Sequence, residues 1–334
     1  MPEGHSVHRL ARQFADVFAG EQLAVSSPQG RFADGAALLD GRVLQSVRAH
    51  GKQLFLRFEG ELYLHVHLGL YGAWDFGGDK TFAGASSIGA PRRVGERELP
   101  GAVPATGAVP TTGGARDGGT GDVGARDGGT GDDGTGDDGA AAYAGPPAPV
   151  RAVRVRLASD HGWADLRGAS VCAVATEPEV DAVLARLGPD PLDAHEDARA
   201  AGEEFARRIL RRRTPVARLL MDQAVVAGIG NVYRAELLFR SRLDPALPGA
   251  EVGTERAFAL WDDAVAAMRN GVRDGRIVTT DPELWPRGSH ALPDPEHAHY
   301  VYKRHGRPCR VCGEDVRLAD EAGRKLYWCP SCQA

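Results

Sequence analysis

Four of the five cysteines lie near the end of the chain, in two closely spaced pairs. Two residues separate Cys309 from Cys312, two separate Cys329 from Cys332, and sixteen residues lie between the pairs. This spacing is typical of a zinc ribbon, in which two tight turns present four thiolates to one tetrahedral ion. Because four thiolates leave no open position on the metal, we expect one structural zinc ion that stabilises a hairpin and takes no part in catalysis.

The start of the chain carries a second chemically useful pair, Pro2 and Glu3. Removal of the initiator Met1 would leave a secondary amine on Pro2, and such an amine can attack an electrophilic carbon to form an iminium. The amine is usable near neutral pH because α-amino groups titrate near pH ~8, and the adjacent Glu3 could transfer protons. Proline and an acid are also common in the first turn of a helix, so these two residues alone leave a purely structural role open.

Positive charge and flexible backbone occur at further places. Arg324 and Lys325 lie just before the second cysteine pair, so the expected hairpin would display a cationic tip to a phosphate. A glycine-rich turn at 226–231 precedes an apolar helix, and the N-terminus of a helix is a common anion site. An ordinary corner between two helices has the same pattern. Lys52, in an expected β-hairpin, would by itself be an unremarkable surface charge.

The periodicity of the apolar residues predicts the elements that position these groups. A helix is expected over 7–18, and alternation at period two predicts strands over 42–49, 53–59, 61–68 and 150–158. Spacing of three to four residues then predicts helices over 180–187, 198–213, 216–223, 232–242 and 254–273. The fold class is therefore α+β, with a small antiparallel sandwich or barrel followed by a helical domain.

Residues 77–149 differ in composition from the rest of the chain, being rich in Gly, Ala, Thr, Asp and Pro. The eight residues 115–122 recur, identical, as 125–132. A repeat this polar cannot form a core, so we expect a disordered Gly/Asp-rich insertion between two strands. The segment holds ten acidic and six basic residues, which argues against a DNA-binding arm.

The overall charge does not indicate a polyanion-binding protein, since the formal net charge is −5. Binding to phosphates depends on a local basic face, however, and residues 207–213 contain five arginines. These arginines could contact phosphates or could form a solvated helix end. No apolar stretch approaches the ~18 residues of a membrane helix, so we expect a cytoplasmic protein that does not contact membranes.

In combination, the motifs resemble the formamidopyrimidine-DNA glycosylase and endonuclease VIII (Fpg/Nei) family. The resemblance spans nearly the whole chain except the insertion, and it rests on Met1–Gly4, Gly51–Leu54, Leu70–Trp74, Leu184–Asp190, Met221–Asn231 and Arg324–Gln333. It implies an N-terminal helix plus antiparallel β-sandwich as catalytic domain (1–185), a helical domain with a helix-two-turn-helix motif (186–296) and a zinc finger (297–334). Damaged double-stranded DNA would bind in the cleft between the domains, and the protein would act as a monomer at the nucleoid.

The resemblance also implies catalytic roles. Pro2 would attack the sugar C1′ while Glu3 acts as acid, so that the lesion base leaves and a Schiff base remains on the enzyme. Lys52 would donate a proton in β-elimination, and Arg324 would assist δ-elimination. The chain would thus be a bifunctional DNA glycosylase and abasic-site lyase of base excision repair.

Four further residues would contact DNA. The resemblance implies that Arg186 and Asn231 hold the kinked backbone. An enzyme that acts on a stacked base must first flip it out, so a side chain must fill the gap. Leu70 and Tyr71 are our candidates for this wedge, although an apolar pair at a strand end has an ordinary structural interpretation too.

Three interpretations of the function remain, two of which differ in the lesion that is excised. Leu70–Trp74 and Tyr327–Pro330 resemble the endonuclease VIII branch, which acts on oxidised pyrimidines, and 164–169 lacks the Arg-Arg-Phe loop of the purine branch. We therefore expect oxidised pyrimidines. Oxidised purines are the alternative, because Gly69 stands where the endonuclease VIII branch often has Gln and His67–Gly69 resembles the purine branch more closely. His5 also departs from the pattern, since many relatives have proline there. A non-catalytic zinc-ribbon protein that binds damaged DNA is the third, and the joint presence of the four catalytic candidates argues against it.

Overall fold

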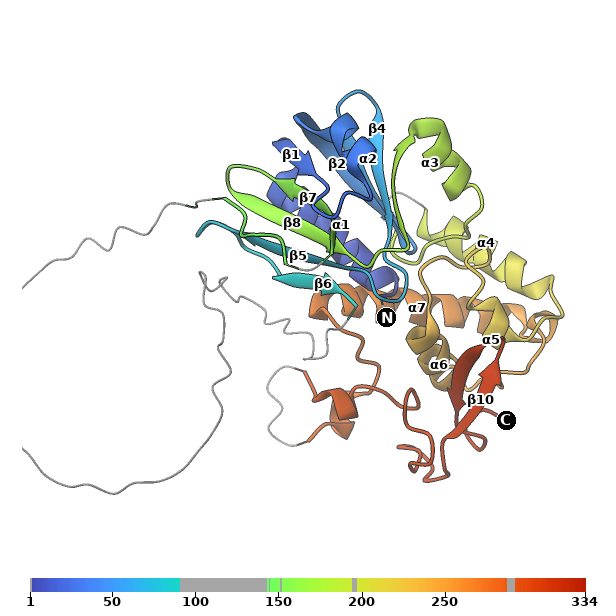
Figure 1. Ribbon diagram of the computed structural model, residues 1–334. Coiled ribbons are helices and arrows are strands. Elements are labelled where there is room, and N and C mark those ends of the chain that lie inside the picture. The colour runs from blue at the N-terminus through green and yellow to red at the C-terminus, as the bar shows by residue number, and fades with distance from the viewer. Residues whose placement is uncertain (1, 91–142, 144, 151, 194–196, 287–291) are drawn as a thin grey trace, which may run out of the picture.

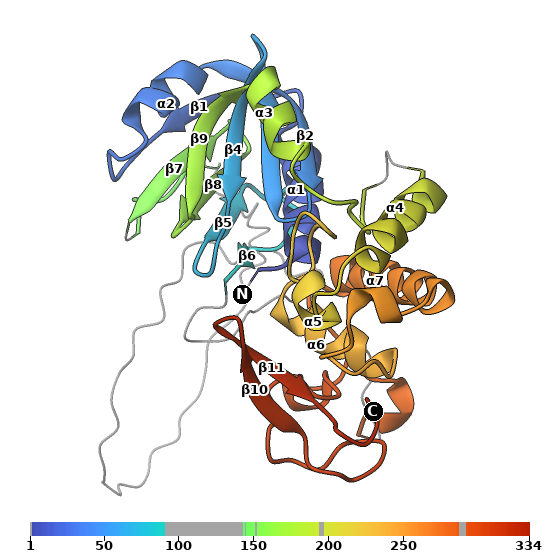
Figure 2. The same cartoon turned by 90° about the vertical axis from the view of Figure 1, so that its right-hand side faces the viewer.

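The chain forms a β-sheet domain followed by a helical domain that carries a β-hairpin (Figure 1). This architecture is seen in a computed structural model, which describes residues 2–90, 143, 145–150, 152–193, 197–286 and 292–334. A view turned by 90° separates the two parts, with the sheet above and the helices and hairpin below (Figure 2). The expected α+β fold, with an N-terminal helix, an antiparallel sheet and a C-terminal helical region, is confirmed.

Nine antiparallel strands of the described residues pair in the order β6-β5-β8-β7-β1-β2-β3-β4-β9. Strand β1 pairs with both β2 and β7 and so joins the two halves of the sandwich. Apolar side chains alternate along the central strands, as the sequence predicts, and those on the inner face form the core. The strands are β1 (Gln22–Ser26), β2 (Arg42–His50), β3 (Gln53–Phe58), β4 (Leu62–His67), β5 (Ala73–Gly78), β6 (Ser87–Gly89), β7 (Val153–Ala158), β8 (Gly162–Arg167) and β9 (Val171–Thr176).

Helix α1 (Gly4–Phe18) buries its apolar face against this core. Leu10, Phe14 and Phe18 recur at helical spacing and are fully buried. The ring of Phe14 meets the edge of Trp74 on β5, with ring centroids 4.8 Å apart. A second short helix, α2 (Ala33–Leu39), follows β1. The packing of α1 fixes where the residues just before it, Pro2 and Glu3, emerge from the domain.

Regular structure extends past the boundary that the sequence suggests for the insertion. Strand β5 continues to Gly78, and Ile88 of β6 pairs with Trp74, so a strand lies inside the expected insertion 77–149. Ile88 is buried in the core and continues the sheet at its edge. The composition shift at Gly77 is thus not a structural boundary. Residues 91–142 and 144 of this range lie outside the described residues.

The second half of the chain forms the helices that apolar spacing predicts. They are α3 (Glu177–Leu184), α4 (Ala198–Leu210), α5 (Val216–Leu219), α6 (Asn231–Arg240) and α7 (Thr254–Asp274). Helices α4, α6 and α7 enclose a separate apolar core in which Phe205, Tyr233, Leu237 and Trp261 are buried. Helix α7 ends at Gly275, whose φ of 74° is the left-handed geometry of a helix C-cap.

The C-terminal hairpin, β10 (Arg317–Glu321) and β11 (Arg324–Trp328), is packed on the helical domain. Leu326 and Trp328 pack into the apolar core of the helices. Tyr327 belongs to a second, neighbouring cluster that includes Ala235 and Phe239 of α6. The hairpin and the helices therefore share a core. The division into 1–185, 186–296 and 297–334 stays a prediction.

Three glycines form a close approach of the two domains. The N–H of Gly4 donates to the carbonyl of Gly228 at 2.9 Å, and a Cβ on either Gly4 or Gly51 would lie 2.9 Å from backbone atoms of Gly228. Gly51 also has a φ of +57°, which a side chain would strain. Only glycine lets the start of the chain, the β2–β3 turn and the 223–230 turn meet at backbone distance.

A buried carboxylate, Asp190, holds the same junction electrostatically. Its oxygens accept hydrogen bonds from His8 Nε2 at 2.7 Å, Gly51 N at 2.6 Å and Leu192 N at 2.9 Å. Burial opposes ionisation, but the hydrogen bonds from His8 and from the two backbone amides keep the pKa of Asp190 below its usual 3.8. The ionised carboxylate thus stabilises the contact between the domains.

We expect D190N to lower the free energy of unfolding by about 2–4 kcal/mol at pH 7. The side-chain amide of asparagine carries no negative charge and cannot accept all three hydrogen bonds that the Asp190 carboxylate accepts. Since the pKa of Asp190 is lowered by folding, its contribution is complete above pH ~4 and is lost as the pH falls through the folded-state pKa. The difference from wild type should therefore shrink in acid. Urea denaturation between pH 7 and pH 3 measures this, with D16N on the exposed side of α1 as control. An equal effect of both variants would contradict the prediction.

Candidate active site and metal centre

Glu3 caps the N-terminus of α6, although it comes from the other end of the chain. Its carboxylate accepts hydrogen bonds from the N–H groups of Gly230 at 2.9 Å, Val232 at 2.8 Å and Tyr233 at 3.3 Å. The N-cap residue of this helix, Gly230, has no side chain to cap it, so Glu3 satisfies amides that the helix leaves unpaired. A Cβ on Gly230 would overlap the Glu3 carboxyl carbon, which explains the glycine.

Lys52 lies beside Glu3 and shares its environment. The Lys52 Nζ donates to the carbonyl of Ile229 at 2.7 Å, directly before the helix that Glu3 caps. Burial raises the pKa of Glu3, while Lys52 and the three backbone amides act in the opposite direction. For Lys52, burial has the opposite effect and lowers the pKa. The positive charge of Arg324 lowers it further, and the negative charge of Glu3 raises it. A carboxyl that can hold a proton and an amine that can lose one are the groups that general acid–base catalysis needs.

The tip of the hairpin reaches this pair. Arg324 is exposed at the start of β11 and is close enough to lower the pKa of Lys52. The carbonyl of the next residue, Lys325, accepts a hydrogen bond from Asn231 Nδ2 at 2.9 Å. Pro2 is buried next to Glu3 in the chain. The structure therefore brings together five of the residues singled out in the sequence, namely Pro2, Glu3, Lys52, Asn231 and Arg324.

The other candidates lie at the periphery. Leu70 and Tyr71 occupy the β4–β5 loop and are 45% and 80% exposed, so their side chains are free to contact a partner. The loop is tight, because Gly72 N donates to the carbonyl of Leu68 at 2.9 Å. Arg186, just after α3, is exposed, and the described hydrogen bonds do not join its side chain to the Glu3–Lys52 pair.

Two buried charges on α6 were not singled out in the sequence. Arg234 is 1% exposed and bonds to the Lys325 carbonyl at 3.1 Å. Glu236 is fully buried and accepts hydrogen bonds from the backbone N–H groups of residues 300–302 and from the hydroxyl of Thr279. Opposite charges within an apolar helix were a visible signal, but the sequence does not tell which face of the helix is covered.

His5 is a third group that sequence reasoning left unexplained. It is buried, and its ring meets the ring of Tyr233 edge-on with centroids 5.5 Å apart. Burial, together with the nearby charge of Arg9, lowers the pKa of His5 to about 3. The imidazole is therefore neutral at physiological pH and adds no charge beside Glu3.

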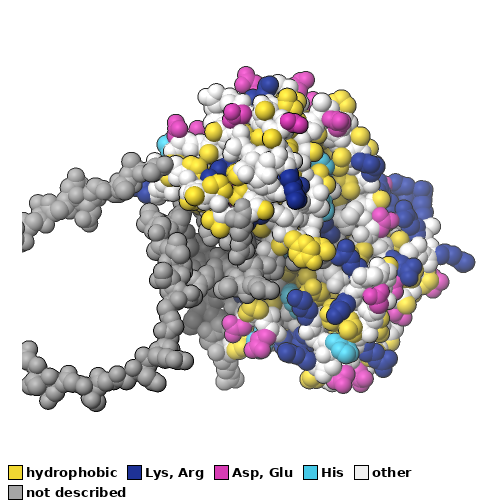
Figure 3. Space-filling model, in the orientation of Figure 1, with side chains coloured by type: hydrophobic (Ala, Val, Ile, Leu, Met, Phe, Trp, Pro, Cys, Tyr) yellow, Lys and Arg dark blue, Asp and Glu magenta, His cyan; other side chains and the backbone are white. Residues whose placement is uncertain are grey.

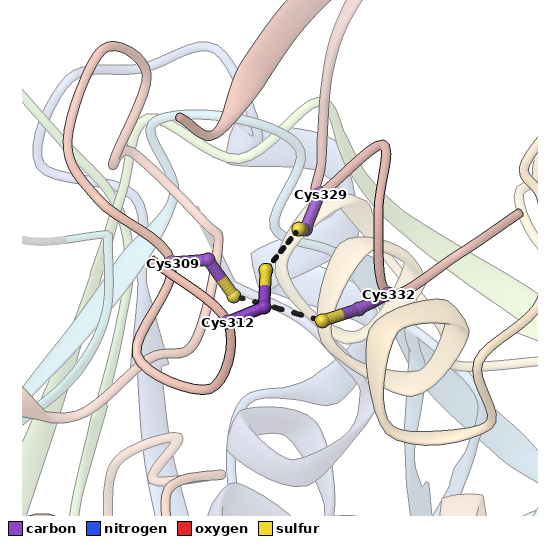
Figure 4. A group of neighbouring side chains, drawn as sticks. All are labelled: Cys309, Cys312, Cys329 and Cys332. Carbon is purple, nitrogen blue, oxygen red and sulfur yellow. Dashed lines mark hydrogen bonds between the residues drawn. The ribbon is translucent and has the colours of Figure 1, made fainter. Parts of the chain in front are cut away.

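The four C-terminal cysteines converge to a metal-binding arrangement (Figure 4). Their Sγ atoms all lie within 4.8 Å of one another, with 3.4 Å between Cys312 and Cys329 and 3.9 Å between Cys309 and Cys332. Tetrahedral zinc with Zn–S bonds of about 2.3 Å needs sulfur atoms about 3.8 Å apart. The donor set and its dimensions thus fit one ion of this kind.

On the face shown in Figure 3, Lys and Arg side chains gather over the helical domain and are sparse over the sheet. Part of the basic run at 207–213 is used within the protein. Arg208 pairs with Glu204 and donates to backbone carbonyls, and Arg212 pairs with Asp222 at 3.0 Å. Arg211 and Arg213 are exposed. Among the described residues, no helix is long and apolar enough to cross a membrane.

The fold and site together define a two-domain protein in which the Glu3 carboxyl and the Lys52 amine lie side by side at the junction, next to the tip of a hairpin flanked by four cysteines. Residues 1–95 match the family model of the formamidopyrimidine-DNA glycosylase N-terminal domain, and residues 187–282 match that of the formamidopyrimidine-DNA glycosylase H2TH domain. The chain is 40% identical over 333 residues to "Endonuclease 8 1" of Mycobacterium tuberculosis, with both chains covered completely. It is 30% identical to "Probable endonuclease 8 2" of Streptomyces coelicolor, covering all of this chain and 94% of the relative.

The chain belongs to the formamidopyrimidine-DNA glycosylase and endonuclease VIII family. It is thus a DNA glycosylase and lyase of base excision repair, and the expectation of an enzyme is confirmed. The fold is similar to that of solved Fpg structures. The MutM (Fpg) protein of Thermus thermophilus aligns with a TM-score of 0.62 and 23% identity over 99% of this chain and 98% of its own. A Lactococcus lactis Fpg complex with a THF-DNA and an inhibitor aligns with a TM-score of 0.67 and 15% identity over all of both chains.

We expect the purified protein to carry one zinc ion, and C312S to lose most of it, because three thiolates and a hydroxyl bind zinc more weakly. DNA binding and strand cleavage should fall with the metal, while the core of the sheet domain stays folded, since it shares no residues with the cysteine cluster. Elemental analysis and fluorescence binding measure both effects. C172S, on β9 in the other domain, is the control. Full zinc content and activity in C312S would contradict the assignment.

Proposed function

We propose that this enzyme excises oxidised bases from duplex DNA through a Schiff base on Pro2, and then cleaves the strand by β- and δ-elimination. The observation that carries the proposal is the convergence of the Glu3 carboxyl, the Lys52 amine and the Arg324-bearing hairpin tip next to Pro2. A fully buried acid beside a partly buried amine, each with its pKa shifted toward the neutral form, is costly for stability and typical of a catalytic site.

In the proposed mechanism, the nitrogen of Pro2 attacks C1′ of the damaged nucleotide once Met1 has been removed. The bond from C1′ to the base breaks, and the base leaves with the proton that the Pro2 nitrogen gives up. Glu3, whose raised pKa favours its protonated form, then protonates the sugar ring oxygen, so that the ring opens and the iminium forms on Pro2. The resulting iminium makes the C2′ proton acidic. Its loss expels the 3′ phosphate, and a second elimination expels the 5′ phosphate.

Lys52 and Arg324 serve the elimination steps. Lys52 can donate a proton because burial lowers its pKa, whereas Arg324 carries a guanidinium, which keeps its protons in proteins and can only stabilise or orient a leaving phosphate. Asn231, whose Nδ2 is anchored on the Lys325 carbonyl, would hold the DNA backbone. Arg186 would contact an outer phosphate, which its exposure permits.

We propose oxidised pyrimidines as the preferred lesions. The relatives of matching full length carry the name endonuclease 8, whereas "Formamidopyrimidine-DNA glycosylase" of Methylococcus capsulatus is 36% identical over only 48% of this chain. Oxidised purines are the second candidate, because both family models bear the formamidopyrimidine name. A panel of duplexes, each with a single lesion, distinguishes the two.

The remaining parts of the proposal concern partners and place. The ligand is damaged double-stranded DNA, and several fold neighbours were solved with damaged DNA bound. The metal would be a single structural zinc on Cys309, Cys312, Cys329 and Cys332. We propose a monomer that works in the cytoplasm at the nucleoid.

Borohydride trapping tests the covalent step. On a duplex with an abasic site or thymine glycol, wild type should form an adduct that maps to Pro2, and an N-terminally blocked form should form none, because the nucleophile is then an amide. P2G retains a terminal amine of lower nucleophilicity, so we expect its trapping rate to fall by about 10-fold or more. Zinc-loaded, DNA-binding wild type without an adduct would support the non-catalytic interpretation instead.

The exposed pair in the β4–β5 loop gives a separate prediction. If Tyr71 and Leu70 fill the space of a flipped base, Y71A and L70A should slow excision from duplex DNA by about 10-fold, since the unstacking of a base costs a few kcal/mol. Excision of the same lesion from a single strand should be nearly unchanged, because there is no stack to fill. L38A, an equally exposed leucine on α2, is the matched control. Equal losses on both substrates would exclude the wedge role.

A further inference from the structure

Arg234 is a deeply buried cation that the proposed mechanism does not use. Its side chain is 1% exposed, and burying a guanidinium is costly unless it is paired and hydrogen-bonded. It lies one turn into α6, after Asn231, and its Nη2 donates both to Asn231 Oδ1 and to the Lys325 carbonyl, the latter at 3.1 Å. Its Nε is buried and has no hydrogen-bond partner among the described residues. The two hydrogen bonds that Arg234 does make therefore go to the hairpin, at Lys325, and to Asn231, which binds the same carbonyl.

The Lys325 carbonyl receives two donors from α6. Asn231 Nδ2 donates to it at 2.9 Å and Arg234 Nη2 at 3.1 Å, so both lone pairs of this oxygen are used. Lys325 directly follows Arg324 in β11, opposite Asp320 of β10. A clamp on this carbonyl fixes the hairpin backbone one residue away from the side chain that reaches the acid–base pair.

The charges around Arg234 agree with this position. Burial lowers the pKa of Arg234, the carboxylates of Glu321 and Glu3 raise it, and Arg324 lowers it. The guanidinium therefore lies within electrostatic reach of both the helix cap and the hairpin tip. A second contact to the tip, between Arg218 of α5 and Glu321, is about half exposed on its arginine side and is screened by solvent. The contact from Arg234, by contrast, is made by a side chain that is itself buried.

We propose that Arg234 is a positioning residue for δ-elimination, which clamps the hairpin so that Arg324 is held over the Glu3–Lys52 pair. This inference rests on the proposed function, since it assumes that Arg324 acts in the last step. Arg234 does not touch the substrate. Its loss should leave formation of the Schiff base intact and let the hairpin tip shift, which weakens only the step that depends on Arg324.

The test compares R234M with R240M on a duplex that contains an abasic site. Methionine keeps an apolar stem and removes the guanidinium. Arg240 is the matched control because it lies on the same helix but binds Asp263 of α7 instead of the hairpin. For R234M we expect borohydride adduct formation within about twofold of wild type, and a ratio of δ- to β-elimination products that is about tenfold lower. R240M should keep the wild-type ratio.

R324A and the double variant R234M/R324A complete a double-mutant cycle. If Arg234 acts through Arg324, R324A should lower the product ratio, and R234M combined with R324A should lower it no further. Arg234→Lys, which keeps the buried charge but cannot serve both acceptors, should lower the ratio by about threefold and guards against misfolding of R234M. A wild-type ratio in R234K or R234M, or additive losses in the double variant, would overturn the inference alone. A wild type that forms no adduct would overturn the proposed function and the inference with it.

Discussion

The capping of α6 by Glu3 is the interaction on which the rest of the site depends. A helix whose first amides are unpaired attracts a carboxylate, and here that carboxylate comes from the third residue of the chain, more than two hundred residues away. The contact fixes two things at once. It places the start of the chain against the helical domain, and it excludes water from the Glu3 carboxyl. Burial then favours the protonated form of Glu3, while the charge of Lys52 favours the ionised form.

The contact is possible because the backbones at the junction approach closely. Gly4, Gly51 and Gly228 have no side chains to keep the three segments apart, and Asp190 ties the β2–β3 turn to the linker that leads into the helices. Glu3 and Lys52 are thus held by rigid neighbours on both sides. An enzyme gains from this arrangement because its catalytic groups need little reorganisation when substrate binds.

Much of this could be predicted from the sequence, for identifiable reasons. The helices and strands follow from apolar spacing, and the cysteine spacing predicts a metal site because tight turns and tetrahedral geometry leave few alternatives. Local patterns could not show which distant groups meet. Arg234 and Glu236 look like ordinary helix charges until the hairpin and residues 300–302 cover them. Strand β6 was missed because it is three residues long and lies at the edge of a compositionally biased segment.

Glu236 has a consequence for how the protein gains and loses structure. Its fully buried carboxylate binds three successive amides of the segment that leads into the first cysteine pair, from the middle of a helix whose N-terminus is capped by Glu3. The metal-binding module is therefore no independent appendage, and it should open and close in one cooperative unit with α6. Metal supply would then act on the whole helical domain. A shortage of a metal held by the four cysteines would disturb the geometry around Glu3 as well as the hairpin, so the capacity for repair would follow metal homeostasis.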